Sequence, residues 1–231
     1  MKNLIKITVF ATFLLSVVAL SASNFLDDET PIAIVKKVIR QVQLRETQES
    51  DWTAVKEGEQ LMQGGEVRTG TKALALVLLT DGSGLLRVRE NSILRIYGER
   101  ENQKVNKNAF IQEGKVGFEV NKQEDEQFKF TTPTMVASIR GTQGVIDSDD
   151  NKVLCEEGII ELAALLGAKE AGVLTAGNTA QITEEGKLVI YTMTDAEKQL
   201  LKQTKQIAPK KMIIETDEGI LEIEYYSEDE E

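Results

Sequence analysis

Short apolar segments separated by glycines or polar residues run along most of the chain after about residue 30. Within them apolar and polar positions often alternate: in an extended chain, Leu86 and Val88 point to one side and Arg87 and Arg89 to the other. Alternation of this kind, broken roughly every 8 to 12 residues by turn-forming residues, is typical of short strands. The pattern predicts an all-β protein, arranged as a solenoid, a sandwich or a barrel.

Several breaks have the composition of tight turns. Asp81-Gly82-Ser83-Gly84 supplies glycines for the positive φ angles of a hairpin, and residues 147–151 separate two further apolar segments. A short motif also recurs with irregular spacing, since Glu113-Gly114, Glu157-Gly158 and Ala176-Gly177 each lead into a strand. Recurring turn and strand units favour stacked rungs, as in a twisted, largely antiparallel β-solenoid, over an α/β layout.

The C-terminal part departs from this pattern. Residues 194–208 are predicted to form a helix, because Thr194 and Glu197 match a capping box. An apolar stripe along this helix consists of Ala196, Leu200, Thr204 and Ile207, and Pro209 ends it. Apolar segments on either side of Asp217-Glu218-Gly219 predict a β-hairpin. Residues 194–226 thus form a helix plus hairpin extension, and residues 227–231 an acidic tail. Residues 163–173 have weak strand character and are predicted to form a loop or short helical turn.

Residues 1–22 have the features of a secretory signal peptide. Lys2 and Lys6 are basic, residues 7–20 are almost wholly apolar, and small residues follow. We expect cleavage near Ala22. The alternative is a retained membrane anchor, since residues 4–22 are just long enough to span a bilayer. No second apolar stretch of that length follows. The mature chain is therefore expected to be exported, to the periplasm or the cell surface, and to have no membrane span.

Composition narrows the classes of function. The formal net charge of −11 would repel nucleic acid phosphates, so no nucleic acid partner is expected. The absence of histidine removes Ser-His-Asp and Cys-His catalysis and histidine-bound zinc. A glycosidase-like pair of carboxylates is the remaining enzymatic alternative. We predict that the chain is not an enzyme and has no catalytic residue and no cofactor.

Two other candidates for chemistry have structural explanations. Residues 147–151 begin like a calcium loop, but Lys152 and Gly158 stand where glycine and glutamate are required, so a hairpin turn and no metal site are predicted. Cys155 is the only cysteine, so no disulfide can form within the chain. Its apolar neighbours place it in the core of a strand.

Four arginines and one tryptophan are the candidate ligand-binding residues. Arg87 and Arg89 share a strand face, Arg95 could lie on the neighbouring strand, and Arg68 completes the set. They could bind a carboxylate-bearing partner or a glycan. The alternative is ion pairing with the local acidic residues Glu90, Glu99 and Glu101. Trp52 could stack on a ligand, or it could belong to the core.

Several short motifs, taken in their order along the chain, resemble a FecR domain between residues 34 and 183. A first strand, Ile34–Gln43, precedes Trp52, near where the family commonly carries a tryptophan. The motifs that follow are Gly58-Glu59-Gln60-Leu61, Gly65-Glu66-Val67-Arg68-Thr69-Gly70, Asp81-Gly82-Ser83, Gln112-Glu113-Gly114-Lys115-Val116, Thr131-Thr132-Pro133, Ile139-Arg140-Gly141-Thr142, Glu157-Gly158 and Ala176-Gly177. No single motif is specific. Together, in the same order as in the family, the motifs are much stronger evidence for the resemblance than any one of them.

The resemblance implies a β-solenoid-like domain on the periplasmic side of a signalling protein. The best-known members of the family are transmembrane regulators, in which a cytoplasmic N-terminus controls a sigma factor and the periplasmic part senses an outer-membrane iron-siderophore transporter. Here only Met1 to Lys6 precede the apolar segment, so direct control of a sigma factor by this chain is not expected.

These observations lead to two hypotheses. The first is a non-catalytic periplasmic or envelope binding or sensing module, whose partner is an envelope protein or a glycan. In this hypothesis the helix and hairpin cap the open end of the solenoid, where edge strands would otherwise be exposed. The second is a structural scaffold of the envelope or cell surface that has no signalling role.

Overall fold

The computed structural model of the chain describes residues 30–101, 104–122, 128–206, 210–216 and 219–225. Met1–Thr30 and Pro31–Glu231 are separate units, and the fold described below is that of the second. The predicted signal peptide and acidic tail lie outside the described residues. No helix in the described part of the chain has the length and apolar character needed to cross a membrane.

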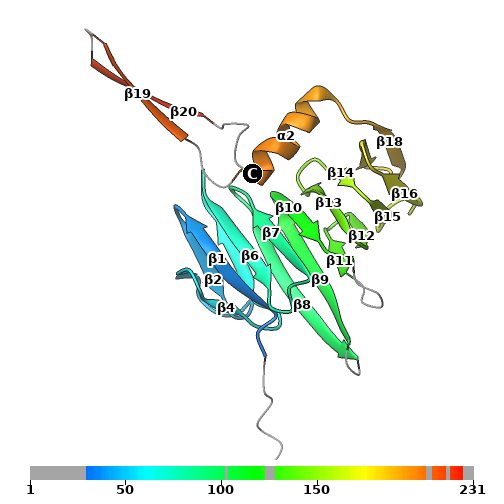
Figure 1. Cartoon of the computed structure of the whole chain (residues 1–231). Coiled ribbons are helices and arrows are strands. Elements are labelled where there is room, and N and C mark those ends of the chain that lie inside the picture. The colour runs from blue at the N-terminus through cyan, green and yellow to red at the C-terminus, as the bar shows by residue number, and fades with distance from the viewer. Residues whose placement is uncertain (1–29, 102–103, 123–127, 207–209, 217–218, 226–231) are drawn as a thin grey trace, which may run out of the picture. The chain divides into compact units, whose positions relative to one another are not determined.

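Most of the described chain forms two nine-stranded sheets (Figure 1). Sheet A contains, in order across the sheet, β18 (Leu188–Thr192), β17 (Asn178–Ile182), β14 (Lys152–Glu157), β13 (Thr142–Asp147), β10 (Lys115–Val120), β7 (Gly84–Val88), β6 (Leu74–Leu79), β1 (Ala33–Ile39) and β4 (Gln60–Leu61). Sheet B contains β16 (Ala171–Thr175), β15 (Ile159–Ala164), β12 (Met135–Ile139), β11 (Phe128–Thr131), β9 (Lys104–Glu113), β8 (Ile93–Glu101), β5 (Glu66–Thr69), β2 (Val42–Arg45) and β3 (Thr53–Ala54). The prediction of a mostly β protein with largely antiparallel pairing is confirmed.

The chain moves back and forth between the two sheets as it advances. Hairpins such as β6–β7 in sheet A alternate with hairpins such as β8–β9 in sheet B, and each crossing places new strands beside earlier ones. The strands therefore follow one another along both sheets in nearly sequential order. Between β9 and β11, both in sheet B, the described chain forms only one strand in sheet A, β10. Because this one strand returns the chain to its starting side, β11 runs in the same direction as β9 and pairs with it in parallel.

The recurring glycine motif lies at crossings between the sheets. Gly114 joins β9 to β10 with φ 83, Gly158 joins β14 to β15 with φ 87, and Gly177 joins β16 to β17 with φ 79. Residues with a Cβ rarely adopt such angles. A Cβ on Gly158 would also lie 2.6 Å from the carbonyl oxygen of Gly141. The motif seen in the sequence thus marks corners at which the chain leaves one sheet for the other.

One apolar core lies between the sheets. Alternate residues of strands in both sheets point into it, and Phe118 of β10 and Phe130 of β11 meet there with ring centroids 4.9 Å apart. Each fully buried side chain of this size contributes about 1.5–3 kcal/mol. Cys155 belongs to the same core with no exposed surface, as predicted.

Two strand predictions are wrong in their bounds. The first strand, predicted as Ile34–Gln43, is two strands, because the chain crosses from β1 in sheet A to β2 in sheet B at Arg40, where φ is 62. Residues 163–173, predicted as a loop, include the end of β15 and the start of β16, so only residues 165–170 connect them. Alternation along one segment does not indicate which sheet the segment joins.

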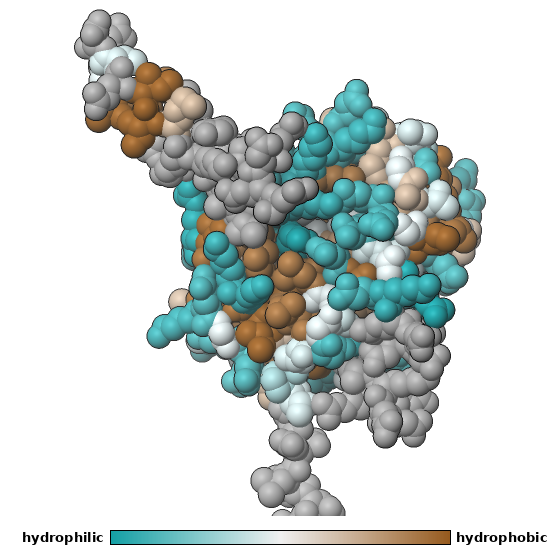
Figure 2. All heavy atoms as spheres, viewed as in Figure 1, coloured by the Kyte–Doolittle hydropathy of each residue, from teal (hydrophilic) through white to brown (hydrophobic). Residues whose placement is uncertain are grey.

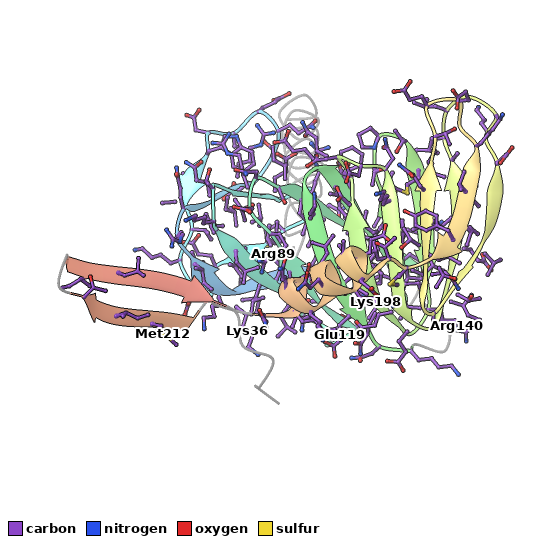
Figure 3. The ribbon with its side chains drawn as sticks, turned by 90° about the horizontal axis from the view of Figure 1, so that it is seen from above. Lys36, Arg89, Glu119, Arg140, Lys198 and Met212 are labelled. Atoms are coloured by element: carbon purple, nitrogen blue, oxygen red, sulfur yellow. The ribbon has the colours of Figure 1, made fainter. Side chains whose placement is uncertain are left out.

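The predicted helix is α2 (Asp195–Lys205), and its capping box of Thr194 and Glu197 is present. It lies on the outer face of sheet A over β10, β13 and β14 (Figure 3). Its buried residues are Glu197, Leu201 and Thr204. Of the predicted stripe, Thr204 is buried and Leu200 is partly buried. Ala196 is exposed, so its prediction is wrong, and Ile207 lies outside the described residues. Leu201 packs against Val145, Leu154 and Met193, which form a second apolar cluster outside the main core.

The C-terminal hairpin is present as β19 (Lys210–Thr216) and β20 (Gly219–Tyr225), which form a sheet of their own. The predicted capping of an open end is wrong for the helix, because α2 covers a face of sheet A. The edge strands of that sheet are β18 and β4. A helix satisfies its own backbone hydrogen bonds, so it buries an apolar stripe against outward-facing side chains rather than pairing with an edge.

Candidate binding surface

The four predicted arginines do not form one patch. Arg87 lies in β7 of sheet A and Arg89 just after that strand, whereas Arg68 and Arg95 lie in β5 and β8 of sheet B. The expectation that Arg95 neighbours the strand of Arg87 is wrong, because the chain crosses between the sheets after β7. Sequence proximity of two strands is a poor guide to pairing where the chain alternates between layers.

The two arginines of sheet A have partners within the chain. Arg87 Nη2 lies 3.2 Å from Glu119 Oε2 on the adjacent strand β10. Arg89 Nη1 donates a hydrogen bond of 3.2 Å to the carbonyl oxygen of Gln206, at the C-terminal end of α2. Glu90, one of the predicted local partners, instead accepts a hydrogen bond from the backbone N–H of Lys72. Glu99 and Glu101 have side chains outside the described part of the structure.

On sheet B, a buried glutamate lies between two arginines. Glu66 has no exposed surface and is flanked in register by Arg45 on β2 and Arg95 on β8. Arg45 Nε lies 2.5 Å from Glu66 Oε2, and Arg95 Nε lies 2.5 Å from Glu66 Oε1. Burial alone would lower the pKa of Arg95, but hydrogen bonds to Tyr97 and Glu66 raise it above its ordinary value. A buried carboxylate needs such partners, because an unpaired charge away from water is costly.

Trp52 lies beside this ion-pair network and not in the core. The guanidinium carbons of Arg45 and Arg68 each lie 4.4 Å from the centroid of an indole ring, and the tryptophan is partly exposed. Arg68 Nη2 also donates to Gln43 Oε1 at 2.6 Å. The alternative in which Trp52 belongs to the core is therefore wrong. Each cation–π contact of this type contributes about 0.5–1 kcal/mol at an exposed site. We call Arg45, Trp52, Glu66, Arg68 and Arg95 the arginine–tryptophan cluster.

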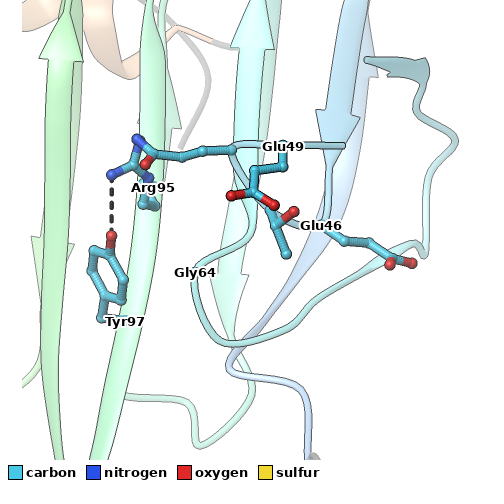
Figure 4. A pocket seen from close by; sticks show the side chains of 7 residues that line it. Glu46, Glu49, Gly64, Arg95 and Tyr97 are labelled. Carbon is cyan, nitrogen blue, oxygen red and sulfur yellow. Dashed lines mark hydrogen bonds between the residues drawn. The ribbon is translucent and has the colours of Figure 1, made fainter. Parts of the chain in front are cut away.

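A depression of about 400 Å³ lies next to Arg95 (Figure 4). Its lining consists of Glu46, Thr47, Gln48, Glu49, Gly64, Arg95 and Tyr97. Arg95 Nη1 donates a hydrogen bond of 3.1 Å to Tyr97 Oη, which leaves the phenolic proton available to an acceptor. Because two carboxylates line the depression and its arginine is paired with Glu66, the site does not suit a carboxylate-bearing ligand. It suits a basic or hydroxyl-bearing group.

A second depression, of about 430 Å³, shares Glu46 with the first. It also contains Asp51 and Glu59, together with apolar surface from Leu44, Leu61 and Met62. Among the charged residues that line each hollow, acidic ones outnumber the single arginine, Arg95 in the first and Arg45 in the second. No local sequence pattern indicates this, because Glu46, Asp51 and Glu59 are separated along the chain and are brought together by the pairing of β1 with β4 and of β2 with β3.

Glu197 has a second role that its place in the capping box did not indicate. Its carboxylate accepts hydrogen bonds from Tyr191 Oη at 2.8 Å and from Thr179 Oγ1 at 3.1 Å, on β18 and β17. Burial would raise the pKa of Glu197, but hydrogen bonds from Thr194, Tyr191 and Thr179 lower it below its usual value. Burial and the neighbouring Glu197 raise the pKa of Tyr191 to about 12. The same residue thus caps α2 and fastens it to sheet A.

Residues 147–151 form the turn between β13 and β14, as predicted. Asp147 Oδ2 lies 2.8 Å from Lys115 Nζ, and Asp149 Oδ1 accepts a hydrogen bond from the backbone N–H of Gly114. Asn151 Oδ1 accepts from Thr134 Oγ1 at 2.6 Å. Among the described residues, no group of three or more acidic, cysteine or histidine side chains is arranged to hold a metal ion.

The thiol of Cys155 is enclosed by the core. Burial, with a smaller effect of Glu156, raises the pKa of Cys155 to about 11. The reactive thiolate is therefore scarce at neutral pH. Cys155 serves as a small apolar residue.

Part of the chain is similar to a known protein family. Residues 65–161 match the model of the FecR protein family. These residues are similar to FecR, and the match covers less than half of the chain. The matched range begins in the motif Gly65–Gly70 and ends within β15, so it lies inside the wider range of 34–183 predicted from the motifs. Glu66, Arg68 and Arg95 lie within the matched range, whereas Arg45 and Trp52 precede it.

Comparisons of the whole chain gave weaker similarities. No curated protein matches it. Two crystal structures of a protein from Parabacteroides distasonis described as an anti-sigma factor are similar, with 16% and 15% identity and TM-scores of 0.46 and 0.49. The similarity covers 55% and 59% of this chain. It covers 59% and 64% of those chains, so this chain spans about three fifths of their length.

Proposed function

We propose that this chain is an exported, non-catalytic binding module in cell-envelope signalling, and that its partner is an envelope protein. The match of residues 65–161 to the FecR family supports this proposal most directly. Envelope signalling is the role associated with that family, and binding rather than catalysis agrees with a surface whose arginines are paired within the chain.

The fold supports a scaffold role for the module. Strands that advance along two sheets at once stack progressively, in the manner of a solenoid, and we propose that the stack acts as a rigid support for its outer faces. The glycine corners at Gly114 and Gly158 have close backbone neighbours, which would oppose movement of one layer against the other.

The partner would bind at the depression beside the arginine–tryptophan cluster. Glu46 and Glu49 offer carboxylates at its rim, and Tyr97 offers a hydroxyl and an aromatic edge. A basic side chain of an envelope protein suits this lining better than an acidic one, and the net charge of −11 would attract a basic partner over a longer range. Glu66, Arg45 and Arg95 hold the surrounding strands in register.

Site-specific photo-crosslinking in intact cells tests this proposal. A photoreactive residue at position 49 is expected to capture one envelope protein, whereas the same residue at the exposed position Ile159 on β15 is not. The double variant Glu46→Gln and Glu49→Gln should weaken the capture about tenfold, a size typical of a lost charge-assisted contact. Glu184→Gln with Glu185→Gln makes the same charge change at exposed positions and should leave capture unchanged. Equal capture from positions 49 and 159 would rule the site out.

Export and signalling need separate measurements. Residues 1–30 fused to a reporter enzyme that is active only outside the cytoplasm should yield activity, and N-terminal sequencing of the exported product should begin near residue 23. Deletion of the gene should change the transcription of a defined set of envelope genes. An exported chain whose loss alters envelope integrity but no transcript would favour the structural scaffold over the signalling module.

A further inference from the structure

The outer face of sheet A has one part that a helix covers and one part that no helix of the described chain covers. α2 covers β10, β13 and β14. Beyond the helix, one outward row across β1, β6 and β7 is apolar: Ile34 pairs with Leu78, and Leu78 pairs with Leu85. These three side chains belong to neither apolar cluster and stay partly exposed. The next outward row, Lys37–Leu76–Arg87, has a cation at either end. Figure 2 shows hydrophobic residues gathered over β1, β6 and β7. An apolar area of this kind next to a covered one indicates a docking surface.

The C-terminal hairpin has an apolar face of its own. In its register Met212 pairs with Ile223, and Ile214 pairs with Leu221, so all four positions share one face. Met212, Ile214 and Leu221 are 47%, 38% and 52% exposed. Ile213 lies on the opposite face, opposite Glu222. A two-stranded hairpin is marginally stable in water unless one face packs against another element. The hairpin therefore needs a surface to cover its apolar face.

The position of α2 brings the hairpin to the edge of the apolar part of sheet A. The helix ends at Lys205, and the carbonyl oxygen of its C-cap residue Gln206 accepts a hydrogen bond from Arg89, just after β7. Only residues 207–209 separate Gln206 from Lys210, the first residue of β19. Four Cα-to-Cα steps reach at most about 14 Å. The two strand spacings from β7 to β1 amount to about 10 Å, so the hairpin can begin over any of these strands at the level of Arg89. Leu85 lies four residues, about 13 Å, further along β7, a length that strands β19 and β20 can span.

The dimensions of the two surfaces also agree. β19 and β20 have 7 residues each, β1 has 7, β6 has 6 and β7 has 5. A hairpin of that length can lie along these strands and pack face to face, as two sheets do in a sandwich. A tether of three residues holds the hairpin at a local concentration of millimolar order, which favours the patch of its own chain over that of a second copy.

We propose that hairpin β19–β20 packs its Met212, Ile214 and Leu221 face onto the outer face of β1, β6 and β7 in the same chain. α2 and the hairpin together then cover most of sheet A and leave the outer face of sheet B as the exposed side of the two-sheet fold. This inference concerns the C-terminal extension and is independent of the partner-binding site proposed above.

Paired cysteines test the docking. In the full chain, Leu221→Cys with Leu78→Cys should form an intramolecular disulfide under mild oxidation, detected as a faster-migrating monomer and by peptide mass. Leu221→Cys with Ile159→Cys, on the outer face of sheet B, should form at least about tenfold less. Native Cys155 is fully buried and should not compete. Disulfide-linked dimers would overturn docking within one chain, and equal yields from both pairs would overturn docking on this face.

Two neighbouring isoleucines on the hairpin provide a matched comparison. Ile214→Glu places a charge on the docking face, and Ile213→Glu places it on the opposite face. Limited proteolysis within residues 215–218 should be about tenfold faster for Ile214→Glu than for the unchanged chain, because the hairpin is released. Ile213→Glu should change the rate less than about twofold. Equal acceleration by the two variants, or acceleration by neither, would contradict the proposal.

Discussion

The outer faces of the two sheets each contain a buried glutamate, and the two are held in different ways. Glu66 on sheet B lies between two cations, Arg45 and Arg95, on adjacent strands. Glu197 sits over sheet A and accepts hydrogen bonds from neutral groups, among them Tyr191 and Thr179. Within the described residues, the ammonium nitrogen of Lys152 lies 3.8 Å from Glu197 Oε1.

The difference shows what each face requires. On sheet B the charges compensate one another within three neighbouring strands, so that face can stay in contact with water without a covering element. On sheet A the outward residues Val145 and Leu154 are apolar, and a helix must cover them. Glu197 fastens that helix, so its hydrogen bonds connect two parts of the chain that would otherwise meet only through apolar contact.

Removing the carboxylate of Glu66 should have the largest effect. Glu66→Ala leaves Arg95, which is only 8% exposed, without its carboxylate partner, and should lower the free energy of unfolding by about 3–5 kcal/mol. Glu119→Ala is the matched control, because its ion pair with Arg87 is near the surface and should contribute less than about 1 kcal/mol. Urea unfolding measures both, and a loss at Glu66 as small as that at Glu119 would contradict the buried network.

Adding a methyl group beneath the helix should have the next largest effect on the stability of the fold. Gly117 in β10 lies beneath α2, and a Cβ there would overlap Cγ2 of Thr204. Gly117→Ala should therefore destabilise the chain by about 1–3 kcal/mol through overpacking. Thr204→Ser removes the overlapping methyl group and should restore most of the loss in the double variant, as measured by thermal unfolding. Additive effects of the two changes would show that they do not meet.

Neutralising Glu197 should cost less and should depend on pH. Glu197→Gln should lower the free energy of unfolding at pH 7 by about 1–2 kcal/mol, since hydrogen bonds to a charged acceptor are replaced by weaker ones. The pKa of Glu197 in the folded chain is lowered from 4.5. The ionised form therefore stabilises the fold above the unfolded pKa, and this contribution is lost as pH falls through the folded pKa. The difference in free energy of unfolding between the unchanged chain and Glu197→Gln should therefore become smaller in acid. A difference that stays constant from pH 7 to pH 3 would contradict this role of the ionised carboxylate.

The smallest effect is expected at Trp52. Trp52→Leu keeps apolar volume but removes the ring beside Arg45 and Arg68, and should lower the free energy of unfolding by about 1 kcal/mol. Trp52 is the only tryptophan, so its fluorescence reports on this cluster alone. Arg68→Ala should change the emission of Trp52, whereas Arg89→Ala on sheet A should leave it unchanged. A response of equal size to both would contradict the contact.

The sequence was sufficient for elements whose signals are local. The capping box at Thr194 and the turns at residues 81–84 and 147–151 depend on residues within a few positions of one another, and all three are present. Glycines such as Gly114 were recognised as the starts of strands, but their role as corners between sheets depends on which layer the next strand joins.

The candidate site was harder to predict because its pairs form between distant segments. Arg95 was expected beside Arg87, but its partner Glu66 lies on β5, which precedes β7 in the chain. Trp52 reaches its position through pairing of the short strands β2 and β3, for which two-residue β3 gives no alternation. The buried stripe of α2 is predicted only in part, at Leu200 and Thr204, because Glu197 looks like a solvent-exposed residue until the hydroxyl groups of Tyr191 and Thr179 are placed beside it.

The sequential order of strands along both layers has a consequence for how the chain acquires its structure. Each newly completed hairpin finds its neighbours already in place, since β10 joins β7, β13 joins β10 and β17 joins β14. A chain delivered with its N-terminus first can thus assemble by extension from one end, without waiting for its last residues. At every stage of such growth, the last strand added to each sheet is an unpaired edge, and these edges reach β16 and β18 when the sheets are complete.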